Sequence, residues 1–127
     1  MLLLHGNKIV HEFPIALGFT PLGHKQQEGD GRTPEGRYHI DFRKENSDYY
    51  RAIRISYPDA ADLKRAQKLG VNPGGAIMIH GQPNGWGWTG ALLQQRDWTY
   101  GCIALGNDHM SIVWDSVAVG TPIKILP

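Results

Sequence analysis

The sequence is poor in cysteine, in net charge and in long apolar runs, and each shortage excludes a class of protein. Cys102 is the single cysteine among 127 residues, so the chain has no internal disulfide and no multi-cysteine zinc site. Thirteen Lys and Arg residues are balanced by twelve Asp and Glu residues, which argues against nucleic acid as a partner. The longest apolar runs have four or five residues, as at 1–4, whereas a membrane span needs about 18.

Glycine and proline are abundant instead, with 16 and 8 residues respectively. This density breaks the chain into short segments, which favours strands joined by turns over a helix bundle. The length and the 41% hydrophobic content fit one folded domain over residues 1–127. We therefore expect a mainly β sandwich or barrel with short helices.

Apolar alternation and turn residues predict strands at 2–5, 8–17, 37–42, 52–57, 76–80, 102–105 and 121–126. Residues 18–36 and 81–97 are expected to form two long loops, with a helical turn at 91–95 as one interpretation of the second.

Two helices are predicted, over 59–69 and from about 107 to 117. The cap of the second helix is expected at Asn107 or Asp108. The apolar residues of the first helix share one face: Leu63, Ala66 and Leu69.

Cys102 follows Gly101 at the start of a predicted strand, where a loop meets a rigid scaffold. Nucleophiles are often mounted at such positions, although an inert structural cysteine also fits the pattern. His80 ends another apolar strand and could point into the same cleft. A Cys–His pair is chemically useful because the imidazole can take the thiol proton. The backbone N–H groups of Tyr100, Gly101 and Cys102 are then candidate donors of an oxyanion hole.

The other histidines are His5, His11, His24, His39 and His109, and they fit surface or half-buried roles, except that His24 could reach a site from its glycine-rich loop. No HxH or HExxH spacing is present, so a catalytic metal is not expected.

Three ordered blocks of the chain resemble the L,D-transpeptidase catalytic domain, also called the YkuD domain. They are Gly29–Tyr38 with its Thr-Pro-x-Gly turn, Ile77–Gly81 with its Ile-His-Gly strand end, and Thr99–Ile103 with its Thr-x-Gly-Cys segment. The tail at 119–123 resembles the closing strand of that family. The resemblance implies a β-sandwich-like fold, Cys102 as nucleophile, His80 as general base, and neither a metal nor an organic cofactor.

The resemblance also implies a reaction on peptidoglycan stem peptides. Cys102 would attack the carbonyl of the L-centre of a diamino acid and release the terminal D-amino acid. A second amine would resolve the acyl-enzyme and form a cross-link in the cell wall. We expect a monomer in the bacterial periplasm or cell envelope, with an export signal or anchor ahead of Met1.

The chain departs from the family pattern at Tyr100, where many members have His, and at Ala104, where many have Arg or Asn. Substrate contacts are therefore expected elsewhere, at Gly81, Arg96, Trp98 and Thr99, with Arg96 as the carboxylate contact. The Asp-Trp-Thr-x-Gly-Cys-Ile-Ala segment resembles a branch whose members hydrolyse. Three alternatives stay open: a murein hydrolase that releases a linked lipoprotein or trims stems, a non-catalytic murein-binding module, and a redox-sensing thiol protein.

Overall fold

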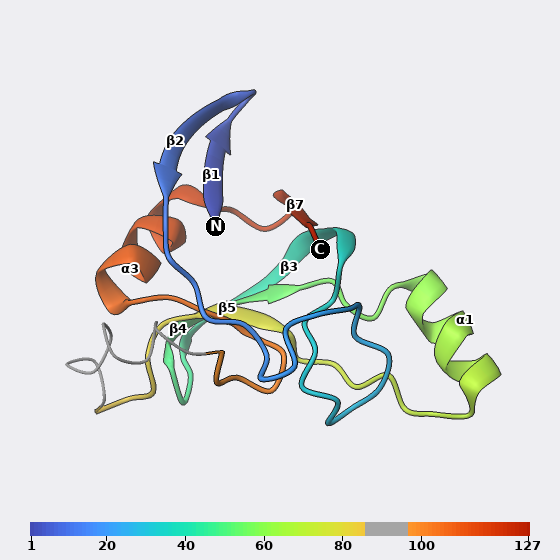
Figure 1. Ribbon diagram of the computed structural model, residues 1–127. Coiled ribbons are helices and arrows are strands. Elements are labelled where there is room, and N and C mark those ends of the chain that lie inside the picture. The colour runs from blue at the N-terminus through green and yellow to red at the C-terminus, as the bar shows by residue number, and fades with distance from the viewer. Residues whose placement is uncertain (86–96) are drawn as a thin grey trace.

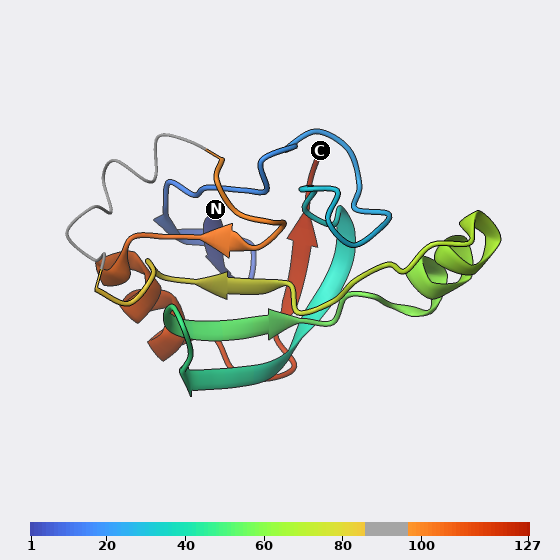
Figure 2. The ribbon, with the colours of Figure 1, turned by 90° about the horizontal axis from the view of Figure 1, so that it is seen from below.

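The structure is a computed structural model that describes residues 1–85 and 97–127. Its centre is a five-stranded mixed sheet in the order β6-β5-β4-β3-β7 (Figures 1 and 2). The strands are β3 (Gly36–Asn46), β4 (Tyr50–Ile55), β5 (Met78–His80), β6 (Ile103–Ala104) and β7 (Pro122–Ile125). Neighbouring strands are antiparallel except β5 and β6, which run parallel. The predicted fold class, mainly β with short helices, is confirmed.

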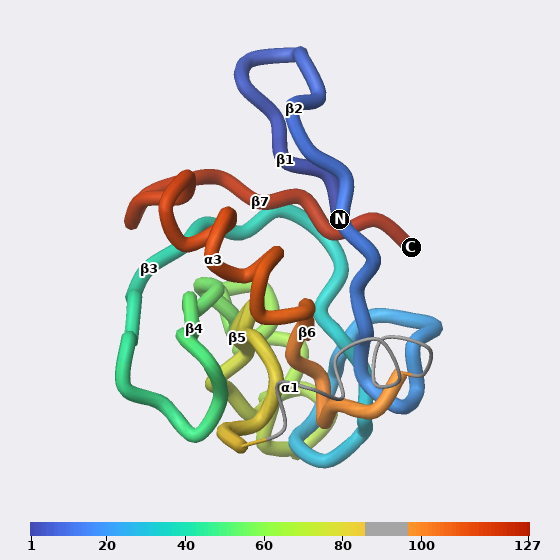
Figure 3. Tube along the Cα trace, turned by 90° about the vertical axis from the view of Figure 1, so that its left-hand side faces the viewer, coloured from blue at the N-terminus to red at the C-terminus, as the bar shows by residue number. Residues whose placement is uncertain are grey.

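Strands β1 (Leu2–His5) and β2 (Lys8–Glu12) form a separate antiparallel hairpin. The turn contains Gly6 at φ 61°, a conformation that glycine adopts without a Cβ clash. Strand β2 ends at Glu12, five residues earlier than the predicted limit of 17, because Pro14 cannot donate to a ladder. The hairpin stands away from the rest of the molecule (Figures 1 and 3).

Helix α3 (Asn107–Ser116) packs on the sheet and closes the core. It lies inside the arc that β3 and β7 make as the sheet curls (Figure 3). Met110 and Val113 are its buried residues. The predicted cap was wrong: Gly106 is the N-cap, and the Asn107 side chain accepts a hydrogen bond from Gln82 N instead, at 2.8 Å.

Helix α1 (Ala60–Leu69) begins and ends where the sequence predicts. Asp59 and Asp62 form a reciprocal capping box, and Gly70 ends the helix in the left-handed conformation at φ 67°. The apolar face is not the buried face, however. The inward residues are Asp62 and Ala66, whereas Leu63 and Leu69 are more than half exposed.

The predicted loop at 18–36 is confirmed except at its last residue, since β3 begins at Gly36. The chain around the start of this loop covers the outer edge of β6. Ala16 and Ala104 exchange two backbone hydrogen bonds of 2.8 and 2.9 Å, and Phe19 N donates to Thr99 O at 2.9 Å. This pairing fixes the chain on both sides of Cys102. The helical turn expected at 91–95 lies outside the described residues. In the part of the chain that the structure describes, no helix has the length and apolarity to cross a membrane.

Candidate active site around Cys102 and His80

Cys102 and His80 are 22 positions apart in the chain, but His80 ends β5 and Cys102 directly precedes β6, the strand that pairs with β5. In the parallel ladder, Ile79 pairs with Ile103 and His80 with Ala104. Cys102 stands one residue before β6 and therefore lies beside the start of β5, at Met78. The topology therefore brings the predicted nucleophile and the predicted base to one edge of the sheet.

The thiol of Cys102 contacts the backbone that leads to His80. Met78 N–H donates to Sγ at 3.4 Å, and Sγ lies 3.5 Å from Ala76 O, to which its S–H can donate. Burial raises the pKa of the Cys102 thiol, while the Met78 N–H bond and the nearby charge of Lys25 oppose that shift. The free site therefore holds a thiol rather than a thiolate at neutral pH.

His80 is 3% exposed, and its Nδ1 lies 2.7 Å from Gly81 O. A carbonyl oxygen only accepts hydrogen bonds, so Nδ1 carries the proton and Nε2 keeps its lone pair. Burial lowers the pKa of the His80 imidazole below its usual range, against the raising effect of the Gly81 bond. The ring is thus a neutral base whose tautomer is fixed.

The turn that carries Cys102 is shaped by Thr99. The buried Thr99 hydroxyl donates to Cys102 O at 2.6 Å and accepts from Gly101 N at 3.1 Å. Gly101 has φ 130°, and a Cβ there would lie 2.6 Å from Arg32 O. No residue with a side chain fits this position without a shift of the backbone.

These contacts bear on the predicted oxyanion hole. Gly101 N–H already donates to Thr99 Oγ1, so that bond must break before it can serve a substrate oxygen. The N–H groups of Tyr100 and Cys102 stay candidates.

The predicted substrate contacts have varied surroundings. Gly81 is buried and packs closely against Asn107, since a Cβ there would lie 2.6 Å from Asn107 Oδ1. Thr99 uses its hydroxyl within the turn, and Trp98 is half-buried with its ring 6.0 Å from that of His80. Tyr100, two residues before Cys102 in the chain, is 78% exposed. Arg96 lies outside the described residues.

Sequence analysis missed Tyr49, which lies in the β3–β4 turn. Its ring stacks on the His80 imidazole with centroids 4.1 Å apart and planes at 29°. No sequence motif marks this residue. It reaches His80 through the pairing of β4 with β5, which a local pattern does not reveal.

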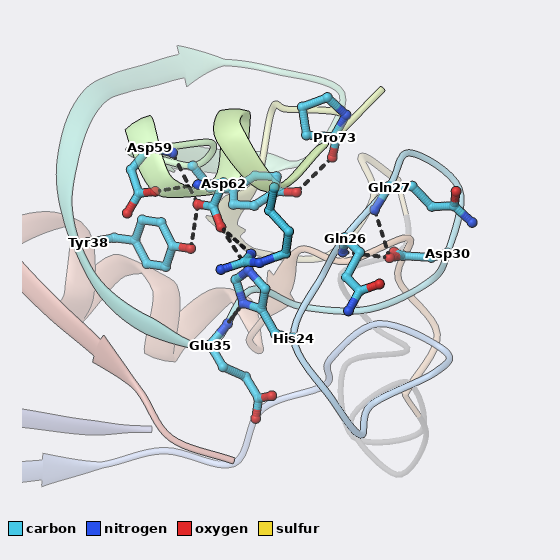
Figure 4. A network of polar contacts seen from close by, with 11 residues as sticks. His24, Gln26, Gln27, Asp30, Glu35, Tyr38, Asp59, Asp62 and Pro73 are labelled. Carbon is cyan, nitrogen blue, oxygen red and sulfur yellow. Dashed lines mark hydrogen bonds and ion pairs between the residues drawn. The ribbon is translucent and has the colours of Figure 1, made fainter. Parts of the chain in front are cut away.

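His24 belongs to a separate network and does not join the site (Figure 4). Its Nε2 donates to Asp62 Oδ1 at 2.8 Å, and its Nδ1 accepts from Glu35 N at 2.8 Å. Asp62 also accepts from the Tyr38 hydroxyl at 2.7 Å. Both ring nitrogens of His24 are used, so the network fastens the long loop to α1.

A buried ion pair holds the same loop. Lys25, 3% exposed, lies 2.9 Å from Asp30 Oδ1, and Asp30 also accepts from three backbone N–H groups (Figure 4 shows two), those of Gln26, Gln27 and Arg32. Within 1–85 and 97–127, no three His, Cys, Asp or Glu side chains gather closely enough to hold a metal ion.

The curled β fold thus places Cys102, just before β6, beside the parallel strand that ends in His80. Residues 1–125 match the YkuD family, the L,D-transpeptidase catalytic domain, and the chain belongs to this family.

The chain is similar to YafK of Escherichia coli (strain K12), with 40% identity over 62 residues, which is 47% of this chain and 23% of YafK. Among solved structures, it resembles the helical cell shape determining protein Pgp2 (K307A mutant) from Campylobacter jejuni at 30% identity and a TM-score of 0.67. That match covers 93% of this chain and 39% of Pgp2. An L,D-transpeptidase from Xylanimonas cellulosilytica shares the fold, with 15% identity, a TM-score of 0.62 and coverage of 98% and 53%. The chain thus spans well under two thirds of these relatives.

Proposed function

We propose that this protein is a cysteine-dependent L,D-transpeptidase that acts on peptidoglycan stem peptides through an acyl-enzyme at Cys102. The observation that carries the proposal is the pairing of β5 with β6, which brings the thiol to the strand that ends in His80. The Nδ1–H bond to Gly81 O supports a base role for His80, because it leaves Nε2 unprotonated.

In the proposed acylation, Sγ of Cys102 attacks the carbonyl carbon of the L-centre while Nε2 of His80 takes the S–H proton. The carbonyl oxygen becomes an oxyanion, which backbone N–H groups of the Thr99–Cys102 turn stabilise. When the tetrahedral intermediate collapses, the peptide C–N bond breaks. His80 returns its proton to the departing amine, and a thioester on Cys102 remains.

The second half of the reaction reverses these roles. His80 takes a proton from an incoming amine or from water, which attacks the thioester and releases the thiol. An amine yields a cross-link, and water yields a trimmed stem or a released lipoprotein. Family membership and the similarity to a cell shape determining protein support wall remodelling in the bacterial envelope, either by transfer or by hydrolysis.

The test is incubation of the protein with a stem tetrapeptide, followed by intact-mass measurement and mass spectrometry of the products. We expect an acyl adduct on the wild-type chain and none on Cys102→Ala. His80→Ala should slow acylation by about 10²–10⁴-fold, as expected for a lost general base. Turnover by Cys102→Ala would overturn the proposal, and an unchanged His80→Ala rate would assign the base elsewhere.

A non-catalytic murein-binding module is the second candidate, and two observations favour it. The pKa of the Cys102 thiol is raised by burial, and Gly101 N–H is already engaged by Thr99. This candidate predicts muropeptide binding without a covalent adduct. Exposure to a carbapenem, which acylates many such cysteines, separates the two: a stable adduct on Cys102 favours the enzyme.

A further inference from the structure

Two aromatic side chains from distant segments enclose the imidazole of His80. Tyr49 stacks on one face of the ring, with centroids 4.1 Å apart. Trp98 approaches at 6.0 Å with its plane at 64°, and the Tyr49 and Trp98 rings are 6.1 Å apart. Among residues 1–85 and 97–127, the bond from Nδ1 to Gly81 O is the polar contact of the ring, and by itself it leaves the ring a freedom of rotation about that atom. A flat aromatic surface against the ring removes that freedom.

The turn that carries Tyr49 is held firmly. The Ser47 hydroxyl accepts from Tyr49 N at 2.9 Å and donates to Tyr49 O at 2.6 Å. Tyr50 N donates to Gln82 O at 2.9 Å, and Gly81 N donates to Tyr50 O at 2.8 Å. The β3–β4 turn is therefore fastened to the residues that directly follow His80, and Tyr49 has a defined place above the ring.

We propose that Tyr49 is a positioning residue, which fixes the plane of the His80 imidazole by stacking and excludes water from it. This inference rests on the proposed role of His80 as general base. A neutral, oriented Nε2 is what that role requires, and small displacements of a catalytic group cost large factors in rate.

The groups that face this pair are few in the part of the chain that the structure describes. Burial raises the pKa of the Tyr49 phenol, as do Cys102, Asp48 and Tyr100, so the hydroxyl stays neutral. On the His80 ring, the Gly81 carbonyl is the acceptor at Nδ1. Arg51, in the adjoining strand, lies over the rings of Tyr50 and Trp114 instead. We therefore assign the effect of Tyr49 on His80 to the stacking of its ring and not to its hydroxyl.

The test compares Tyr49→Phe, which keeps the stacked ring, with Tyr49→Ala, which removes it. The pKa of His80 is followed by NMR titration of its ring protons, and Cys102 acylation by a carbapenem is followed by mass. Tyr49→Ala should move the His80 pKa upward, toward the ordinary value of about 6.5, since water then reaches the imidazolium form. It should also slow acylation by roughly 10–100-fold. Tyr49→Phe should match the wild type in both measurements.

Tyr50→Phe is the matched control, because it loses only the hydroxyl contact of 2.7 Å to Ser111 and should leave the His80 titration unchanged. Thermal unfolding of each variant distinguishes a protein that no longer folds from a folded protein in which the His80 ring has lost its orientation. An unshifted His80 pKa in a folded Tyr49→Ala protein would overturn the inference. So would Tyr49→Phe behaving like Tyr49→Ala. The titration needs no turnover, so it reads out Tyr49 even if the proposed reaction fails.

Discussion

At the scale of single residues, burial shifts the pKa values of the Cys102 thiol and the His80 imidazole in opposite directions. The pKa of the Cys102 thiol is raised and that of the His80 imidazole is lowered, because each charged form loses hydration. A preformed thiolate–imidazolium pair is therefore disfavoured in the free site. In the proposed reaction the proton moves as the sulfur attacks, so the orientation of Nε2 matters more than the charge of the resting pair.

Gly101→Ala tests how strictly the turn before Cys102 requires glycine. An alanine would adopt φ 130° with its Cβ 2.6 Å from Arg32 O, so strain and a backbone clash add. We expect a loss of about 2–4 kcal/mol in the free energy of unfolding, measured by urea denaturation. Gly70→Ala is the matched control, since φ is 67° but nothing lies within 4 Å, and it should lose about 1 kcal/mol. Equal losses for the two variants would show that the clash is relieved.

The sequence predicted Cys102 and His80 because Cys102 begins an apolar segment and His80 ends one, each beside a glycine, which is a local pattern. Tyr49 has no such pattern. Its place beside His80 comes from the register of β4 on β5. This register pairs Ala52 with His80 and so brings the β3–β4 turn next to the imidazole. Pairing between strands this far apart in sequence is not readable from either strand alone.

At the scale of elements, α1 shows which signals are local. Its ends were predicted correctly because the Asp59 cap and the Gly70 stop act within one turn. Its buried face was not predicted correctly, because the partners of Asp62 come from outside the helix. They are His24 from the long loop and Tyr38 from β3. An acidic residue ordinarily indicates the solvent side of a helix. Here hydrogen bonds to its carboxylate replace the lost hydration.

We therefore expect Asp62→Ala to lose more stability than Leu63→Ala. The order would be the reverse if the apolar residues formed the buried face of the helix. Removal of the Asp62 carboxylate leaves the Tyr38 hydroxyl and His24 Nε2–H without their acceptor and breaks the capping box. We expect a loss of about 3 kcal/mol or more in the free energy of unfolding. Leu63 is 53% exposed, so Leu63→Ala should change stability by no more than about 0.5 kcal/mol. Urea denaturation of both variants checks the order, and a larger loss for Leu63→Ala would contradict the buried-face assignment.

At the scale of the whole molecule, the site is assembled from segments that are distant in the chain. The strand ends at His80 and Cys102, the β3–β4 turn and the stretch at 16–19 all meet there. The long loop packs against the Cys102 turn, since Arg32 O lies against Gly101 and the charge of the buried Lys25 acts on Cys102. The composition predicted a β fold with long loops, but it did not predict that one of these loops would pack against the turn that carries Cys102.

The stability of this loop should depend on pH through Asp30. Burial alone would raise the pKa of Asp30, but hydrogen bonds from Gln26, Lys25, Gln27 and Arg32 outweigh it and hold the pKa at about 2. A carboxylate whose pKa is lower in the folded state stabilises the fold above its unfolded value of about 3.9 and loses that contribution as the pH falls toward 2.

Asp30→Asn should therefore be less stable than the wild type at pH 7, and the difference should shrink as the pH falls from about 4 toward 2. Urea denaturation across this range measures it. Asp41→Asn is the matched control, because the Asp41–Arg54 pair is at the surface and should contribute no more than about 1 kcal/mol. A difference between Asp30→Asn and the wild type that stays constant with pH would mean that the ionised Asp30 carboxylate does not hold the loop.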